Sequence, residues 1–111
     1  MKKDTIQSTI YIGLNDMDTG IQKYDTEKYM SILKNVCRSY QVAFSVQLIK
    51  GGYFHEDGRY TEENTLSLRL VDVPDEVVTE IATDLCAFFH QESVMATVSH
   101  CMTYFVHEHL D

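Results

Sequence analysis

The chain has 111 residues, of which 44% are hydrophobic, and a formal net charge of −8 at pH 7. This length suits one domain over residues 1–111 with a single core that needs no disulfide or metal for stability. The negative charge repels phosphate backbones and argues against direct binding to DNA or RNA. No apolar run approaches the ~20 residues of a membrane span, and no secretory signal is evident, so we expect a cytoplasmic protein.

The first part of the chain predicts a strand and then a helix. Residues 5–14 alternate between apolar and polar side chains, which is typical of a half-buried strand. From Asp25 to Tyr40 the apolar residues follow the spacing of a helix. Either Asp25 or Thr26 is suited to cap the start of that helix.

The middle of the chain predicts a β-hairpin. Residues 41–48 and 66–70 both alternate, and the polar segment 51–64 lies between them. Asp57-Gly58 favours a two-residue type I′ turn, because both central positions of that turn have positive φ. The arms of the hairpin are therefore expected to continue beyond the core.

The last part of the chain predicts a second helix and a long final strand. Pro74 suits the first turn of a helix that buries apolar residues as far as Phe89, and residues 92–106 follow as a strand. The order is βαββαβ. With right-handed crossovers this order predicts a ferredoxin-like α+β fold, in which two helices cover one face of a four-stranded antiparallel sheet.

The final strand also predicts self-association. Residues 94–106 contain no lysine, carboxylate, proline or glycine, which are the residues that usually protect an exposed sheet edge. Apolar side chains occur on both faces of this strand, so both faces require cover. We expect a homo-oligomer, most simply a dimer, formed through this edge or through the sheet face opposite the helices. The alternative is that the C-terminal tail folds back over the strand.

The second helix carries a row of carboxylates, Glu76, Glu80 and Asp84, four residues apart. They share one helix face, where like charges repel mildly. One interpretation is a solvated face partly neutralised by Lys28, Lys34 or Arg38 of the first helix. The other is a docking stripe for a basic protein partner.

Polar residues near the hairpin suggest a small-molecule site. The predicted ligand-binding residues are Tyr53, His55, Glu63, Asn64 and Gln91, at the junction of the hairpin with the end of the second helix. The alternative is that these side chains cap the helix and satisfy the hairpin, with His55 facing solvent.

Metal and catalytic motifs are weak in this sequence. The segment from Asp16 to Gly20, with Asp18 and Glu27, resembles the start of a calcium loop, but Ile21 stands where that loop requires glycine. We therefore interpret it as a turn from strand to helix and expect no metal, cofactor or catalytic residue. His107 and His109 form a terminal pair that offers only two metal ligands.

Single cysteines and histidines also have structural interpretations. We expect Cys37, Cys86 and Cys101 to be buried, reduced thiols. His100 is in phase with apolar residues of the last strand, which favours a core or interface position.

Several short motifs resemble a small bacterial family classified as a domain of unknown function. They are Gly52-Tyr53, the turn glycine Gly58, Glu63-Asn64-Thr65-Leu66, Phe89 with Gln91-Glu92-Ser93-Val94 and, more weakly, Tyr11-Ile12-Gly13-Leu14. The resemblance implies a ferredoxin-like layout and supplies no catalytic residue. Tyr53 stands where the family often has tryptophan, and the export signal of some members is missing. Short acidic chains of this kind are similar to cargo of phages and mobile elements, which implies an accessory or counter-defence role.

These observations lead to three functional hypotheses. The first is a non-enzymatic, oligomeric binding protein that docks on a basic nucleic-acid-handling protein through its acidic C-terminal half. The alternative is a binder of small molecules or nucleotides, with sites near residues 51–64 and Gln91. The third, an enzyme built on histidine and carboxylate pairs, has the weakest support in the sequence.

Overall fold

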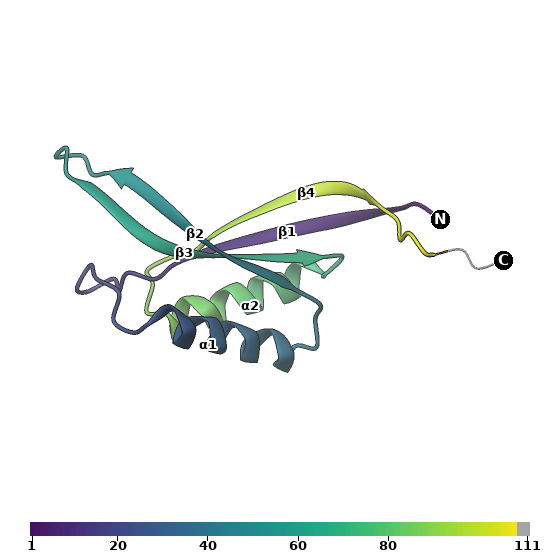
Figure 1. The fold of residues 1–111 in the computed structure, drawn as a ribbon, viewed down its shortest axis with the longest axis horizontal. Helices are drawn as coiled ribbons and strands as arrows, with labels where there is room; N and C mark the ends of the chain where they lie inside the picture. The colour runs from purple at the N-terminus through teal and green to yellow at the C-terminus, as the bar shows by residue number, and fades with distance from the viewer. Residues whose placement is uncertain (109–111) are drawn as a thin grey trace.

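The computed structural model describes residues 1–108 as one antiparallel sheet with two helices packed on the same face (Figure 1). The elements are β1 (Lys3–Gly13), α1 (Thr26–Ser39), β2 (Ser45–Phe54), β3 (Tyr60–Val71), α2 (Asp75–Phe88) and β4 (Met95–Thr103). The strands lie in the order β2-β3-β1-β4. This is the ferredoxin-like α+β fold that the element pattern predicts.

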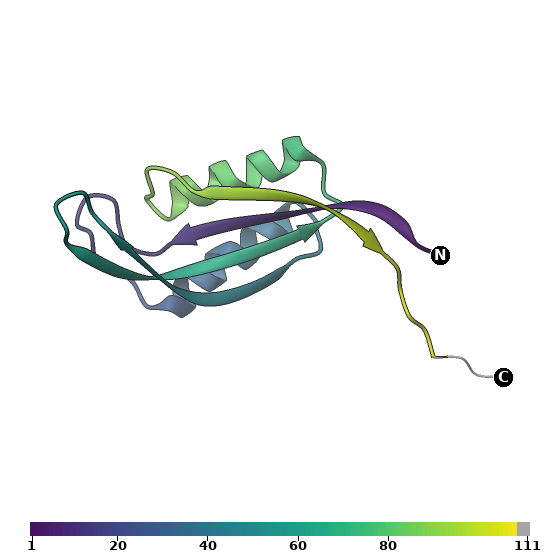
Figure 2. The ribbon, with the colours of Figure 1, turned by 90° about the horizontal axis from the view of Figure 1, so that it is seen from above.

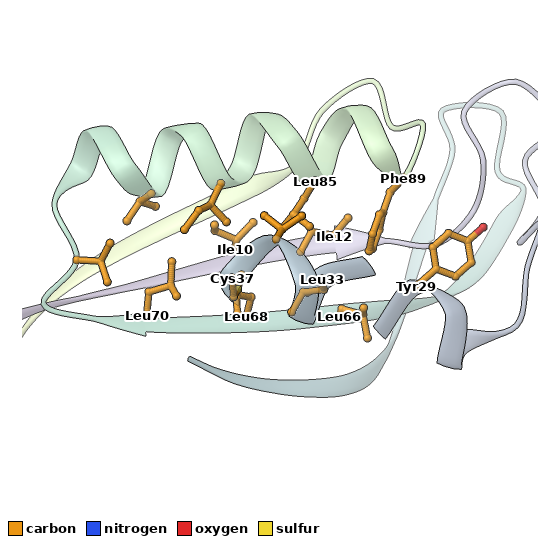
Figure 3. Close-up of a cluster of buried hydrophobic side chains, with 14 of the residues drawn as sticks. Ile10, Ile12, Tyr29, Leu33, Cys37, Leu66, Leu68, Leu70, Leu85 and Phe89 are labelled. Carbon is orange, nitrogen blue, oxygen red and sulfur yellow. The ribbon is translucent and has the colours of Figure 1, made fainter. Parts of the chain in front are cut away.

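The core lies between the helices and the sheet (Figure 3). Ile10 pairs with Leu68 and Ile12 pairs with Leu66, so these residues of β1 and β3 point to the same face. All four are fully buried. At one end of the core, the ring of Tyr29 in α1 meets the ring of Phe89 edge-on, with 5.1 Å between centroids. The alternation seen in the sequence therefore corresponds to the helix-covered face.

The two helices begin differently. Asp25 caps α1, because its Oδ1 accepts a hydrogen bond from the backbone N–H of Lys28 at 3.0 Å. Pro74 is the N-cap residue of α2 and makes no side-chain capping hydrogen bond. The sequence predicts Pro74 inside the first turn, so the helix begins one residue later than predicted. Asp75 and Glu76 in the first turn of α2 favour the positive end of the helix dipole.

The hairpin between β2 and β3 is confirmed, but the predicted type I′ turn is wrong. Among its tip residues only Gly58 has positive φ, at 88°. His55 N–H donates to the carbonyl of Arg59 at 2.8 Å, and Gly58 N–H donates to the carbonyl of His55 at 3.0 Å. The loop therefore has three residues and ends with glycine in the left-handed conformation, an arrangement common in β-hairpins.

Strand β4 lies at the sheet edge, as predicted, and Figure 2 shows the chain beyond it leaving the body of the molecule. The strand is shorter than the predicted 92–106. Its large apolar side chains and those of the following residues are exposed, namely Met95, Val98, Met102, Tyr104, Phe105 and Val106. Phe105 and Val106 are the most exposed of them, at 79% and 84%. No part of the described chain folds back over them.

The sequence also leads to expectations about membrane-spanning segments and about the C-terminal histidines. Within residues 1–108, no helix is long and apolar enough to cross a membrane. His107 is exposed, and His109, the other member of the terminal histidine pair, lies outside the described residues.

Candidate functional site

A cavity of about 510 Å³ lies at the end of the sheet, where the hairpin, the loop after β1 and the segment after α2 meet. Its walls are mostly polar. They are formed by Asn15, Asp16, Met17, Thr19, Gly20, Tyr53, His55, Arg59, Thr61, Glu63, Gln91, Glu92 and Ser93. This volume is within the range of small-molecule sites in proteins, about 300–1,000 Å³.

The loop from Asn15 to Gly20 is held by its own backbone. Asp16 N–H donates to the carbonyl of Ile21 at 2.9 Å, and Gly20 N–H donates to the carbonyl of Asp16 at 2.8 Å. The Oδ1 atom of Asp16 also accepts hydrogen bonds from the backbone N–H groups of Asp18 and Thr19. The segment is therefore a compact turn between strand and helix, in agreement with the sequence interpretation.

Two residues after α2 attach this loop to the end of that helix. Gln91 Nε2 donates to the carbonyl of Asn15 at 2.6 Å and to that of Phe89 at 3.3 Å. The carbonyl of His90 accepts from the N–H of Met17 at 3.1 Å. His90 has a φ of 52°, a left-handed conformation that costs energy for a residue with a side chain.

The carboxylate of Glu63 lies across the end of β1. Its Oε2 accepts a hydrogen bond from the N–H of Asn15 at 3.2 Å. Gly13 leaves room for it, because a Cβ atom added there would be 2.6 Å from Glu63 Oε2. The glycine therefore determines where this carboxylate can lie.

One wall of the cavity is aromatic. The rings of Tyr53 and His55 are 5.0 Å apart between centroids. His55 Nε2 is hydrogen bonded to Thr61 Oγ1 at 2.7 Å, so the expectation that His55 simply faces solvent is wrong. This hydrogen bond across the hairpin holds the imidazole in place beside Tyr53.

The cavity wall is predominantly acidic. Asp16, Glu63 and Glu92 contribute three carboxylates, and Arg59 is the cation among the lining residues. Arg59 Nε is already paired with Asp57 at 2.7 Å. The hydrogen bond from His90, followed by the backbone donor of Asp18, lowers the pKa of Asp16 below its usual value. The same contact with Asp16 raises the pKa of His90.

The structure brings four of the five predicted ligand-binding residues, Tyr53, His55, Glu63 and Gln91, to this one cavity. Asn64 is separate, because its Nδ2 donates to Gln22 Oε1 at 2.8 Å and it does not line the cavity. Gln91 also caps the end of α2, so the structural alternative holds for that residue as well. Ligand binding itself stays a prediction.

Sequence reasoning missed several residues of this site. The sequence indicates Asp16 and Met17 only as part of a segment that resembles a calcium loop, and it indicates no role in a site for His90 or Gly13. The signal for Gly13 is its place at the end of the alternating segment, where a side chain would be expected on the open face. The left-handed backbone of His90 has no comparable signal in the sequence.

The acidic stripe of α2 is only partly free. Glu76 and Glu80 are exposed, whereas Asp84 is half-buried and accepts a hydrogen bond from the hydroxyl of Tyr40 at 2.7 Å. This contact raises the pKa of Tyr40 to about 12. Within residues 1–108 none of the three carboxylates forms an ion pair with a lysine or arginine, so Lys28, Lys34 and Arg38 of α1 do not pair directly with them.

Burial confirms the expectation for Cys37, whereas Cys86, Cys101 and His100 are less buried than expected. Cys37 is fully buried, but Cys86 and Cys101 are half-buried, so only the first is a core thiol. Cys86 donates to the carbonyl of Gln91 at 3.0 Å. His100 is exposed on β4, which excludes a core position in the single chain.

No protein-family model matches this chain, and no curated protein matches it in sequence. Solved structures share its fold at low identity. A phage SAM lyase in complex with S-methyl-5'-thioadenosine aligns with a TM-score of 0.65 and 18% identity, covering 89% of this chain and 88% of that one. The GlnK–ATP complex of B. subtilis aligns with a TM-score of 0.58 and 14% identity, covering 88% and 82%. CPII from Thiomonas intermedia, bound to ADP, AMP and acetate, gives 0.55 and 11%, covering 95% and 93%.

The comparisons therefore define a class, small ferredoxin-like α+β proteins, and at these identities they show the fold alone.

Proposed function

We propose that the cavity binds an adenosine-type small molecule that carries a positive charge, with S-adenosylmethionine as the first ligand to test. The observation that carries this proposal is the charge of the wall. Glu63 and Glu92 line the cavity together with Asp16, whose carboxylate is itself hydrogen bonded to His90, and the one guanidinium among the lining residues is already paired with Asp57. A cationic ligand gains attraction from such a wall, and the attraction is stronger where water is partly excluded.

The aromatic side of the cavity suits the adenosine part of such a ligand. Purine rings stack on aromatic side chains, and Tyr53 with His55 offers a preformed pair of rings. Met17, which is 51% exposed, adds a polarisable apolar surface to the same cavity. The site thus pairs an aromatic surface with carboxylates, as a nucleoside with a cationic centre requires.

The same charges disfavour a nucleoside polyphosphate. ATP or ADP is named with two of the similar structures. In this chain, however, a polyphosphate would meet three carboxylates and one engaged arginine. Like charges at short range cost several kcal/mol, so the proposal selects the sulfonium over the phosphate.

Isothermal titration calorimetry tests this proposal directly. We expect S-adenosylmethionine to bind more tightly than S-adenosylhomocysteine, its uncharged thioether analogue, and ATP to bind least. Glu63→Gln should remove about 1–3 kcal/mol of binding free energy for the sulfonium and little for the thioether. Glu62→Gln is the matched control, because Glu62 is exposed, accepts from Tyr60 and does not line the cavity. Tighter binding of ATP than of S-adenosylmethionine would contradict the proposal.

Cleavage of the bound sulfonium is the second candidate function. It is supported by a similar structure described as a SAM lyase in complex with S-methyl-5'-thioadenosine. That compound is what remains when the bond between sulfur and the aminobutyryl group of S-adenosylmethionine breaks. The electron pair of that bond stays on sulfur, which becomes a neutral thioether. The ligand's own carboxylate oxygen forms the new bond to the carbon that sulfur leaves, which releases the aminobutyryl group as a lactone, so no external oxidant, reductant or co-substrate is needed.

Chromatography of an incubation with S-adenosylmethionine distinguishes binding from cleavage. Formation of S-methyl-5'-thioadenosine above the rate of the protein-free control, reduced in Glu63→Gln, identifies a lyase. Stoichiometric binding without that product identifies a non-enzymatic binder, which is the class that the sequence favours.

We propose further that the chain assembles into a homo-oligomer through β4. The unpaired edge of this strand and its exposed apolar side chains, Met95, Val98 and Met102, support the proposal. Light scattering coupled to gel filtration should give a multiple of the chain mass, 12.8 kDa. A monomer at high protein concentration would contradict it.

Docking on a basic protein partner through Glu76, Glu80 and Asp84 stays a proposal as well. The exposure of Glu76 and Glu80, without a lysine or arginine partner among the described residues, supports it. If the triple change to glutamine leaves the affinity and salt dependence of a basic partner unaltered, this stripe is not the docking surface.

A further inference from the structure

Three side chains that could bind a metal ion converge beside the cavity. They are Asp16 and Asp18 from the loop after β1, and His90 from the segment after α2. One ligand atom from each lies within 4.8 Å of the others. His90 Nδ1 is 2.7 Å from Asp16 Oδ2, and His90 Nε2 is 3.5 Å from Asp18 Oδ2. The two segments are far apart in sequence, so this arrangement is produced by the fold.

The loop presents Asp16 in a fixed orientation. Its Oδ1 is occupied by the backbone N–H groups of Asp18 and Thr19, which leaves Oδ2 directed at His90. The residue is only 6% exposed, so its carboxylate is held by the protein and cannot swing freely into solvent. The hydrogen bond from Met17 N–H to the carbonyl of His90 holds the two segments at this spacing.

We propose that Asp16, Asp18 and His90 bind a divalent transition-metal ion of the Zn²⁺ or Mn²⁺ type. Two carboxylates and one neutral imidazole supply two negative charges, which match a divalent cation. This ligand set suits borderline metals, whereas Ca²⁺ requires about six to eight oxygen ligands. The histidine changes the interpretation of the loop, which the sequence compares only with an all-oxygen calcium site.

With these three ligands alone, the coordination of such an ion is incomplete. Three protein ligands leave at least one coordination position for water or for a bound molecule. Asp16 lines both the metal cluster and the cavity wall. An ion bound here would therefore lie beside the cavity and cancel part of its negative charge.

The same three residues also interact with one another through hydrogen bonds and ion pairs. The experiment therefore has to distinguish metal binding from a purely structural role of these contacts. Chelator-treated full-length protein is titrated with ZnCl₂ and, separately, with MnCl₂ by calorimetry. We expect one high-affinity ion per chain. Asp18→Asn and His90→Gln should each weaken this binding at least about tenfold. Asp18 is 69% exposed, so its variant is expected to fold.

Two matched controls carry the same chemical changes elsewhere. Asp4→Asn changes an exposed carboxylate at the opposite end of β1, and His100→Gln changes an exposed histidine of β4. Both should bind the metals like the unmodified chain. Side-chain NMR signals of His90 should shift on addition of ZnCl₂ in the unmodified protein.

The proposal is overturned by absence of binding to both metals, or by binding that Asp18→Asn and His90→Gln leave unchanged. The second result identifies adventitious binding at other histidines and cysteines. Because no nucleoside is present in these titrations, their outcome is independent of the function proposed for the cavity.

Discussion

The core beneath the sheet and the cavity at its end are built from different kinds of contact. In the core, Ile10, Leu66 and Leu68 meet because each strand presents alternate residues to the helices. In and beside the cavity, polar side chains form hydrogen bonds with backbone or side-chain groups that are 48 to 76 residues away in the sequence. A change in the core should therefore act on folding, whereas a change in the cavity should act on binding.

Among these changes, Leu68→Ala should have the largest effect on the free energy of unfolding, because it alters the core. Leu68 is fully buried and lies opposite Ile10 and Val46 in the sheet. The lost contacts and the cavity left behind should lower the free energy of unfolding by about 2–5 kcal/mol. Urea denaturation measures this effect. Its exposed neighbour gives the control, since Arg69→Ala should change the stability by no more than about 0.5 kcal/mol. Ligand affinity per folded molecule should not change in either variant.

Alkaline pH should weaken the same core through Cys37. Burial raises the pKa of this thiol from 9.0 to about 11. Well below pH 9 both folded and unfolded chains keep the proton, so the thiol adds no pH dependence there. As the pH rises to about 11 only the unfolded chain ionises, and the folded state should lose about 2–3 kcal/mol.

Urea denaturation under reducing conditions across this pH range checks the prediction. Cys37→Ala removes the titrating group, so its stability should start lower, because a buried side chain is shortened, but fall less steeply. Parallel pH profiles for the two proteins would contradict the assignment to Cys37.

The sequence predicts features that depend on local patterns better than features that depend on contacts between distant segments. The alternation of β1 and the helical spacing of α1 are local patterns, and together with the order of elements they are sufficient for the ferredoxin-like topology. The errors lie where several conformations satisfy the same pattern. Asp57-Gly58 is compatible with a two-residue or a three-residue turn, and the structure has the latter.

The site was predictable only in part, for a physical reason. The hairpin prediction places Tyr53, His55 and Glu63 near one another, because Tyr53 and Glu63 belong to the paired strands β2 and β3 and His55 directly follows β2. The pairing of His90 with Asp16 depends on a left-handed residue after α2 and on the packing of the loop after β1. Neither feature follows from local propensity, so the ligand chemistry of that loop could be judged only once the fold was known.

Gly13→Ala changes the cavity wall at Glu63 and leaves the side chains of the core unchanged. The added Cβ would collide with the carboxylate of Glu63, which is the flexible end of a side chain and can move away. Because that movement breaks the hydrogen bond from Asn15 N–H to Glu63 Oε2, we expect the unfolding free energy to fall by no more than about 1 kcal/mol. The affinity for S-adenosylmethionine should fall about tenfold, because the displaced carboxylate no longer lies against the ligand. Calorimetry and urea denaturation together measure both effects.

Gly51→Ala is the matched control for this change. It lies on β2 opposite Glu63, but an added Cβ would meet Thr65 Oγ1 at 3.6 Å, an ordinary contact. Equal losses of affinity in the two variants would mean that Gly13 has no special relation to the Glu63 carboxylate.

Gln91→Ala should have the smallest effect of these changes. It tests whether the loop after β1 unfolds locally, without unfolding of the core. The change removes the hydrogen bonds from Gln91 Nε2 to the carbonyls of Asn15 and Phe89. The unfolding free energy should fall by about 1 kcal/mol, and the N–H of Met17 should exchange with deuterium faster, because its bond to His90 lies in the same junction. Amide exchange in the core of α1 should not accelerate beyond the change in global stability. Gln47→Ala, at an exposed position of β2, should leave both rates as they are. The contrary result is that Met17 N–H exchanges no faster in Gln91→Ala than in Gln47→Ala. That result would mean that the backbone turn of the loop after β1 holds the loop alone, and that the Gln91 hydrogen bonds do not limit its local unfolding.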